Sequence, residues 1–215
     1  MKINLTKKGY LKYKFELQEL LFWIAYIPWL FSWMLTYTWL KPIIHPYGIG
    51  KVWTLVGGIA LFIRVIYIRN SKIIPVIFTG IMIFIALFVT LGNANVNFIF
   101  YTMLLILSSR RIEADKIIKV TFYLQLILLC ITVVPAALGI IYNEAQYSEN
   151  GLRLRHLLGF RYCTDSANFY LSFILEYIYL CREKKIGIIK SIVFILIGYY
   201  IFIQTDTKEA FLLIV

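Results

Sequence analysis

Charged residues are scarce in this 215-residue chain. They make up 15% of it and hydrophobic residues 61%, whereas soluble domains usually carry about a quarter charged and about half apolar residues. So few charges cannot cover the surface of a soluble globule, and so many apolar residues exclude a disordered chain. Four long runs contain no charge at all, at 20–40, 73–109, 120–143 and 191–205.

The chain also lacks the features of several other protein classes. Its three cysteines, Cys130, Cys163 and Cys181, are expected at different membrane depths, which excludes a disulfide framework. No A-x-A-like cleavage site follows the first apolar run, so we expect this run to be retained as a span. Metal-ligand spacings, a P-loop and a Gly-x-Ser-x-Gly motif are absent from the sequence, and we expect no cofactor.

The apolar runs predict an all-α, polytopic bundle of about seven transmembrane spans and the start of an eighth. About 20 apolar residues in a helix cross a hydrocarbon core of about 30 Å. The polar cluster Gly92–Asn97 divides the run 73–109 into a hairpin of two spans. The predicted order is a basic leader at 1–19, spans 1 to 5 within 20–142, an outer loop at 143–166, spans 6 and 7 within 167–204, and an outer turn with the start of an incomplete span at 205–215.

Basic residues set the predicted orientation. With the N-terminus inside, the cytoplasmic segments hold 15 of the 22 Lys and Arg residues and the outer segments hold 6, while Arg64 lies within a span. Cytoplasmic loops of membrane proteins carry this excess. We therefore expect a multi-pass protein of the cell membrane, with 110–119 and 182–190 cytoplasmic and 143–165 outside, and the net charge of +11 does not indicate nucleic acid as a partner.

The outer loop departs from that bias, because Arg153, Arg155, His156 and Arg161 lie within nine positions. Arginine suits bidentate binding of phosphate or carboxylate. The arginines alternate with leucines, which suggests a segment with one face on lipid or protein and a site for an amphiphile with an anionic head. The alternative is a solvated loop whose arginines bind lipid headgroups.

Glu176 is a second polar position of interest, inside predicted span 6. An ionisable residue within a membrane span is a functional candidate by default. The alternative is a structural partner for Arg182 or Arg64 near the cytoplasmic surface.

The loop resembles that of bacterial O-antigen polymerases and ligases and of the related exopolysaccharide and capsule polymerases. An arginine precedes Leu158-Gly159-Phe160 and a polar run ending at Asn168, where the family often has Arg-x-x-Gly-Phe and then His-Pro-Asn. In the family, a later span commonly ends in a Thr/Ser-rich turn that contains an arginine. Here Thr205–Phe211 occupies that place, with Lys208 where the family tends to have the arginine. The resemblance covers about residues 150–215, and the His-Pro pair is absent.

The resemblance implies glycosyl transfer at the outer face of the membrane. The donor would be a glycan on undecaprenyl pyrophosphate and the acceptor another lipid-linked repeat unit, so that a surface polysaccharide grows without a nucleotide sugar or a metal. Membrane lipids and other polysaccharide-export machinery are the further partners expected. For such a transfer we expect Arg153, Arg155 and Arg161 as pyrophosphate ligands, with Asn168 and Lys208 in support. His156 and Asp165 are the base candidates within the loop, and the resemblance implies that the main base lies beyond Val215.

Two other functions remain open from the sequence. A flippase or transporter for the same lipid-linked substrates would place arginines within its spans, whereas here they concentrate outside. A ligase that hands finished glycan to an acceptor is not separated from a polymerase by this stretch of chain. Family members are longer, and Ala210–Val215 begins a helix that is not completed. We therefore expect an N-terminal fragment that is inactive alone.

Overall fold

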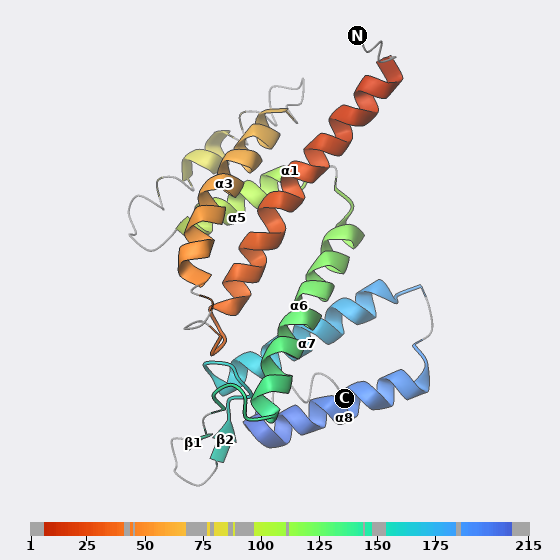
Figure 1. Cartoon of the computed structure of the whole chain (residues 1–215). Helices are drawn as coiled ribbons and strands as arrows, with labels where there is room; N and C mark the ends of the chain where they lie inside the picture. The colour runs from red at the N-terminus through yellow and green to blue at the C-terminus, as the bar shows by residue number, and fades with distance from the viewer. Residues whose placement is uncertain are drawn as a thin grey trace. The chain divides into compact units, whose positions relative to one another are not determined.

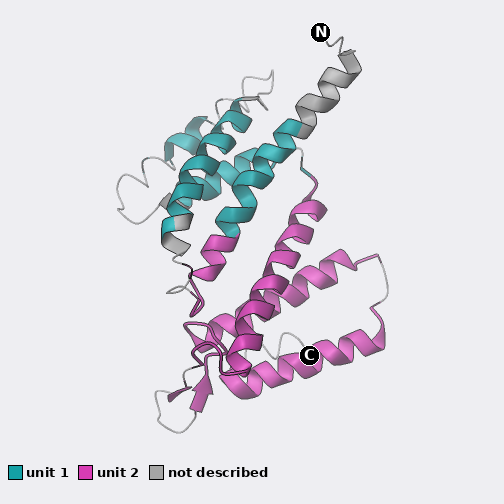
Figure 2. Ribbon diagram, in the orientation of Figure 1, with its two compact units in different colours: residues 1–30, 48–112 teal, residues 31–47, 113–215 magenta. Residues whose placement is uncertain are grey.

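The computed structural model describes residues 7–40, 44, 46–67, 77, 80–85, 88, 97–110, 112–143, 145–147, 154–183 and 186–207. The chain divides into two compact units, which are coloured separately in Figure 2. Unit 1 comprises residues 1–30 and 48–112, and unit 2 comprises residues 31–47 and 113–215.

The helices of unit 1 whose bounds the structure describes are most of α1 (Lys7–Leu35), α3 (Pro46–Tyr67) and α5 (Asn97–Ser108), and residues 80–85 are also helical. They meet around Tyr101, whose side chain is buried. The Tyr101 hydroxyl donates a hydrogen bond of 3.0 Å to the carbonyl oxygen of Ala25, and its ring stacks on Trp29 at 4.9 Å between centroids. Gly57 of α3 lies where any side chain would collide with that hydroxyl.

Arg64 of α3 is buried, and its guanidinium binds carbonyl oxygens at the end of α5. Its Nε donates to the carbonyl oxygen of Ser108 at 2.7 Å, and its Nη2 donates to that of Arg110 at 3.3 Å. The last carbonyls of a helix have no partner within the helix, so the guanidinium caps α5 from a neighbouring helix. The guanidinium Cζ of Arg64 also lies 5.7 Å from the centroid of the Phe22 ring, which is a cation–π geometry.

Unit 2 contains α6 (Ala114–Ala137), β1 (Ala145–Tyr147), β2 (Leu154–His156), α7 (Cys163–Leu180) and α8 (Ile188–Thr205). α7 packs against both α6 and α8 (Figure 1). An ion pair of 2.8 Å joins Arg182, just after α7, to Asp115 at the start of α6, so α6 and α7 run in opposite directions. Ala167 near the start of α7 shares a core with Ile201 near the end of α8, so α7 also opposes α8.

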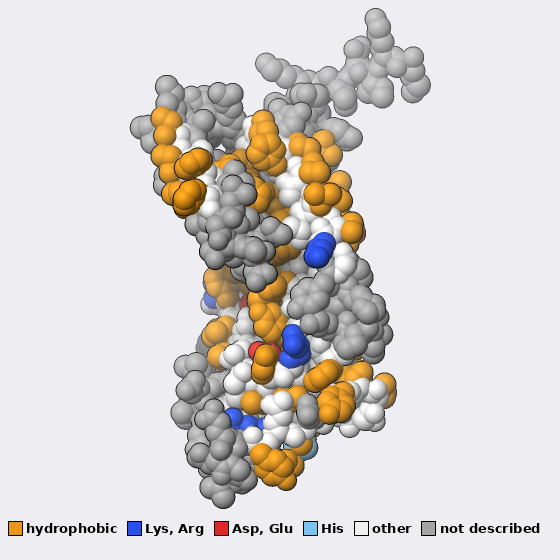
Figure 3. All heavy atoms as spheres, turned by 90° about the vertical axis from the view of Figure 1, so that its left-hand side faces the viewer, with side chains coloured by type: hydrophobic (Ala, Val, Ile, Leu, Met, Phe, Trp, Pro, Cys, Tyr) orange, Lys and Arg blue, Asp and Glu red, His pale blue; other side chains and the backbone are white. Residues whose placement is uncertain are grey.

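Two of the described helices, α6 and α8, are long and apolar enough to cross a membrane. In each, only 17% of the most apolar 18-residue window is buried. Their apolar side chains therefore face outward, unlike those of a soluble core helix, which supports membrane association. Hydrophobic side chains are likewise exposed on the face drawn in Figure 3. The prediction of about seven transmembrane spans is wrong, because the other described helices do not meet these criteria.

The reason lies in helix length and composition. α5 has 12 residues, which is about 18 Å of helix against a hydrocarbon core of about 30 Å. α7 is as long as α8, with 18 residues, but it is less apolar because it carries Asp165, Asn168 and Glu176. The charge-free run 20–40 is not one helix either, because α1 ends at Leu35 and turns follow. The predicted hairpin at 73–109 is described only in part, because residues 73–76, 78–79, 86–87 and 89–96 lie outside the described residues, and the predicted start of an eighth span lies outside them entirely.

Candidate functional site

The arginine loop, which we define as residues 143–165, is built around a small hairpin and a tight turn. β1 and β2 pair antiparallel, with Gln146 opposite Arg155. The turn follows at Leu157–Phe160, where the Phe160 N–H donates to the carbonyl oxygen of Leu157 at 3.0 Å. The side chains of Leu157, Leu158 and Phe160 are buried. This part of the loop is therefore anchored in unit 2.

Both central residues of the turn have left-handed backbone conformations. Gly159 has a φ of 79° and Leu158 a φ of 51°. Glycine adopts this region without cost, whereas leucine rarely does. Leu158 is held there because its side chain belongs to the core of unit 2 and its N–H donates to the Asn143 Oδ1 at 2.9 Å. Strained residues of this kind persist only where their surroundings fix them, and they cluster at functional sites.

Gly159 is also required by close packing. A Cβ at this position would lie 2.8 Å from the backbone oxygen of Thr132 and 2.9 Å from the Ile141 Cδ1. α6 and the chain after it therefore press directly against the turn. The glycine at position 159 thus has a structural reason in this chain.

A second segment, residues 36–40 after α1, clamps the turn from another side. The Trp39 N–H donates to the Gly159 oxygen at 2.9 Å, and the Arg161 N–H donates to the Tyr37 oxygen at 2.8 Å. Thr38, fully buried, forms an isolated antiparallel bridge with Phe160. These are main-chain contacts, so no pattern of side chains in the sequence predicted them.

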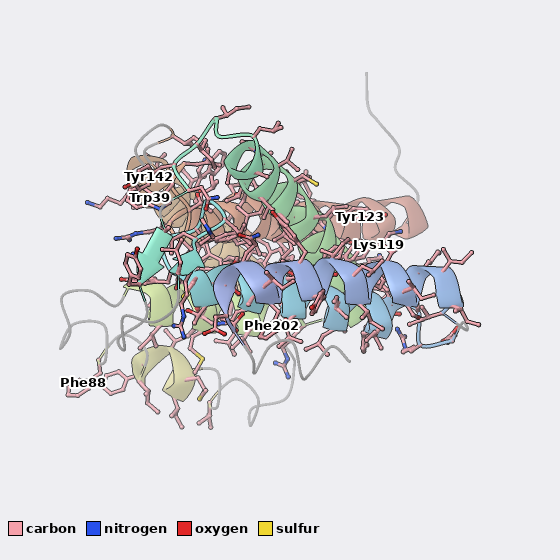
Figure 4. All side chains as sticks on the ribbon, turned by 90° about the horizontal axis from the view of Figure 1, so that it is seen from below. Trp39, Phe88, Lys119, Tyr123, Tyr142 and Phe202 are labelled. Atoms are coloured by element: carbon pink, nitrogen blue, oxygen red, sulfur yellow. The ribbon has the colours of Figure 1, made fainter. Side chains whose placement is uncertain are left out.

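Aromatic rings line this contact. Phe160 stacks on Phe169 at 5.5 Å, and Trp39 meets Tyr142 edge-on at 5.0 Å between centroids. Figure 4 shows Trp39 and Tyr142 side by side. The Trp39 Nε1 is buried and has no hydrogen-bond partner among the described residues.

Arg155 of β2 is held by an acid from the end of α8. Its Nη2 lies 3.4 Å from the Asp206 Oδ2, and the two side chains are 33% and 17% exposed. The Arg155 Nε is buried without a partner in the described part of the chain. Asp206 caps α8 in a left-handed conformation, with a φ of 52°. This pair joins the arginine loop to the end of α8, and sequence reasoning did not identify Asp206 as a site residue.

The other predicted site residues lie around the turn with differing exposure. Arg161 is exposed directly after the turn, and His156 is half-buried at the end of β2 opposite Ala145. Asp165 lies in the first turn of α7, and Asn168 is exposed one turn further along. Arg153 and Lys208 lie outside the described residues.

Asp165 has the environment of a proton acceptor. Burial raises the pKa of its carboxyl above the ordinary value and outweighs the lowering by a Tyr162 backbone hydrogen bond and by the Arg161 guanidinium. Its Oδ2 is buried with no partner among the residues that the structure describes. A carboxylate with a raised pKa accepts a proton more readily than an exposed one.

The two ends of α7 provide a test of orientation. Cys163 begins α7 at the arginine loop and Cys181 follows its other end, beside Arg182; neither cysteine is in a disulfide. If α6 crosses the membrane with its start, where Asp115 pairs with Arg182, in the cytoplasm, an impermeant maleimide added to intact cells should label Cys163 and leave Cys181 unlabelled. Cys163→Ser and Cys181→Ser variants identify the labelled site. Labelling of Cys181 alone would invert the orientation.

Comparisons with known proteins leave the family open. No protein-family model matches the chain, and neither the curated proteins nor the solved structures include a similar one.

Proposed function

We propose that this chain takes part in polymerising lipid-linked oligosaccharide repeat units of a surface polysaccharide, by glycosyl transfer at the outer face of the cell membrane. The observation that carries the proposal is the ion pair between Arg155 and Asp206. It unites two stretches that lie far apart in the sequence and that separately resemble the polymerase family. The C-terminal parts of α6 and α8 both contact the arginine loop, through Thr132 and through the cap residue Asp206, so two apolar helices support the site on one side of the membrane.

The arrangement suits a pyrophosphate leaving group. As the glycosidic bond breaks, negative charge accumulates on the pyrophosphate, and fixed cations at that point lower the barrier. Asp206 orients the Arg155 guanidinium by holding one of its nitrogens, while Arg161 is exposed on the adjacent turn. Guanidinium groups bind phosphate oxygens in a bidentate manner that lysine does not reproduce.

Asp165 is the preferred general base within this proposal. It must take the proton from the acceptor hydroxyl as that oxygen attacks the anomeric carbon. Its carboxyl is partly buried, lacks a partner for one oxygen and lies close enough to Arg161 to feel its charge. His156, by contrast, pairs along the hairpin with Ala145 and has no comparable setting.

The proposal is tested in cells whose surface polymer depends on this protein. Arg161→Ala and Asp165→Asn should each lower the amount of long polymer at least about tenfold, because one charge-assisted hydrogen bond is worth about 1.5–3 kcal/mol. Single repeat units should accumulate on the lipid carrier at the outer face. Lys190→Ala, exposed at the opposite end of α8, is the matched control and should leave polymer length unchanged.

The Asp165→Asn variant should also separate activity from stability. The folded-state pKa of Asp165 is raised, so ionising it costs stability as the pH rises through that pKa. At neutral pH the variant should melt no lower than the wild type while polymer is lost. Accumulation of repeat units at the inner face would indicate a flippase, and long polymer retained on the carrier would indicate a ligase.

A further inference from the structure

The contact between α6 and α7 contains buried polar groups that the proposed glycosyl transfer does not use. Gln125 of α6 is 5% exposed, and its Nε2 donates to the Ser172 Oγ of α7 at 3.0 Å. The Gln125 Oε1 has no partner in the described part of the chain, and neither has the buried Glu176 Oε2. Two oxygens that need donors are thus present in one helix interface.

Glu176 lies on the side of α7 that faces α6. Residues three and four apart share one face of a helix, and Glu176 lies four residues after Ser172 and three before Tyr179. Ser172 bonds Gln125, and the Tyr179 hydroxyl bonds the Asp115 Oδ1 at 3.2 Å, both on α6. Glu176 therefore lies between two contacts with the same helix, about one turn from the Arg182 end.

The expected basic partner of Glu176 is engaged elsewhere. Arg182 pairs with Asp115 at 2.8 Å, and Arg64 donates to the carbonyl oxygens that end α5. The titratable groups at this level of the packed helices are Lys119 and Tyr123 of α6 and Lys190 of α8, which are all exposed. No ion pair or hydrogen bond joins any of them to Glu176 among the described residues.

We propose that Glu176, with Gln125 and Ser172, forms a proton-binding site between α6 and α7 that exchanges with the side of the membrane on which Arg182 lies. Glu176 is half-buried and its Oε2 is fully buried; ionising a carboxyl whose buried oxygen has no cation or donor is disfavoured, and the proton supplies the missing donor. The protonated carboxyl donates to the Gln125 amide oxygen directly or through a water molecule. The site lies at the end of α7 opposite the arginine loop, so it is separate from the candidate transfer site.

The first test compares thermal unfolding of the whole chain in detergent across pH. The wild-type melting temperature should fall above neutral pH, because ionisation of Glu176 leaves the interface without a donor. Glu176→Gln keeps shape and polarity and should remove this fall, melting higher than the wild type at alkaline pH. Lys119→Gln is the matched control and should fall as the wild type does. Equal profiles for wild type and Glu176→Gln, or a flat profile for Lys119→Gln, would overturn the proposal.

Two further measurements make the result decisive even where a variant does not fold. Infrared spectra of wild-type protein at neutral pH should contain the carbonyl band of a protonated carboxylic acid, and ¹³C-labelled glutamate should shift it. Absence of that band rules out the protonated site. Sodium chloride should not raise wild-type stability at alkaline pH more than choline chloride does. A sodium-specific gain that Glu176→Gln abolishes would replace the proton by a sodium ion.

Discussion

Gly159→Ala is expected to unfold the arginine loop and to abolish polymer formation. The new Cβ would lie 2.8 Å from the Thr132 backbone oxygen, and the residue would have to keep a φ of 79°. A left-handed conformation costs a non-glycine residue about 1–2 kcal/mol, and overpacking costs about 1–3 kcal/mol. The sum is a large part of the total stability of a small unit. Thermal unfolding and polymer length are the measurements.

Two other glycines distinguish the cost of the left-handed backbone from the cost of overpacking. Gly139 has a φ of 71° but open space around its Cβ position, and Gly187 has open space and an ordinary φ. Gly139→Ala should therefore lower stability by the conformational cost alone, and Gly187→Ala should change it little. If Gly159→Ala melts no lower than Gly139→Ala, the close approach of α6 to the turn is not what fixes the loop.

Arg155→Ala is expected to remove at least nine-tenths of long polymer while changing stability little. The pair with Asp206 is 33% and 17% exposed, and ion pairs in such positions contribute about 1 kcal/mol or less. In the proposed transfer, the loss of the guanidinium that would bind pyrophosphate is larger, about 1.5–3 kcal/mol per charge-assisted bond. Arg155→Lys should also lower polymer output, since it keeps the charge and loses the planar fork.

Asp206→Asn tests how Arg155 is oriented. Asparagine tolerates the left-handed backbone of this position, so the variant removes charge without disturbing the end of α8. It should lower polymer output less than Arg155→Ala does. The double variant Arg155→Ala, Asp206→Asn should be no worse than Arg155→Ala alone, because Asp206 acts through Arg155. Additive losses would give Asp206 a role of its own.

The sequence predicted some elements well because their signal is local. The apolar runs 120–142 and 191–204 predicted helices that overlap α6 and α8, the two described helices long and apolar enough to cross a membrane, although α6 begins at Ala114 and ends at Ala137. The same criterion failed where absence of charge did not mean continuous helix. Residues 36–40 are as free of charge as residues 20–35 of α1, yet they form turns and a backbone bridge.

The site was partly predictable and partly not. Arg155, Arg161 and Asp165 were identified from residue types around Leu158-Gly159-Phe160. In the structure these three residues lie close to the Leu157–Phe160 turn in the chain. The clamp by Tyr37, Thr38 and Trp39 was missed because main-chain hydrogen bonds are open to almost any residue. The left-handed Leu158 was missed because leucine rarely adopts that backbone, and only the surrounding core explains it.

The bridge between Thr38 and Phe160 also determines the order in which the loop assembles. The two bridged residues are more than a hundred positions apart in the chain. Closing so long a loop costs entropy before any contact compensates it. During synthesis, residues 37–39 are made before residues 159–161, so their main-chain groups can form these hydrogen bonds only once residues 159–161 have been made. The arginine loop is therefore a late product of folding, completed only after α6 is in place to receive Gly159.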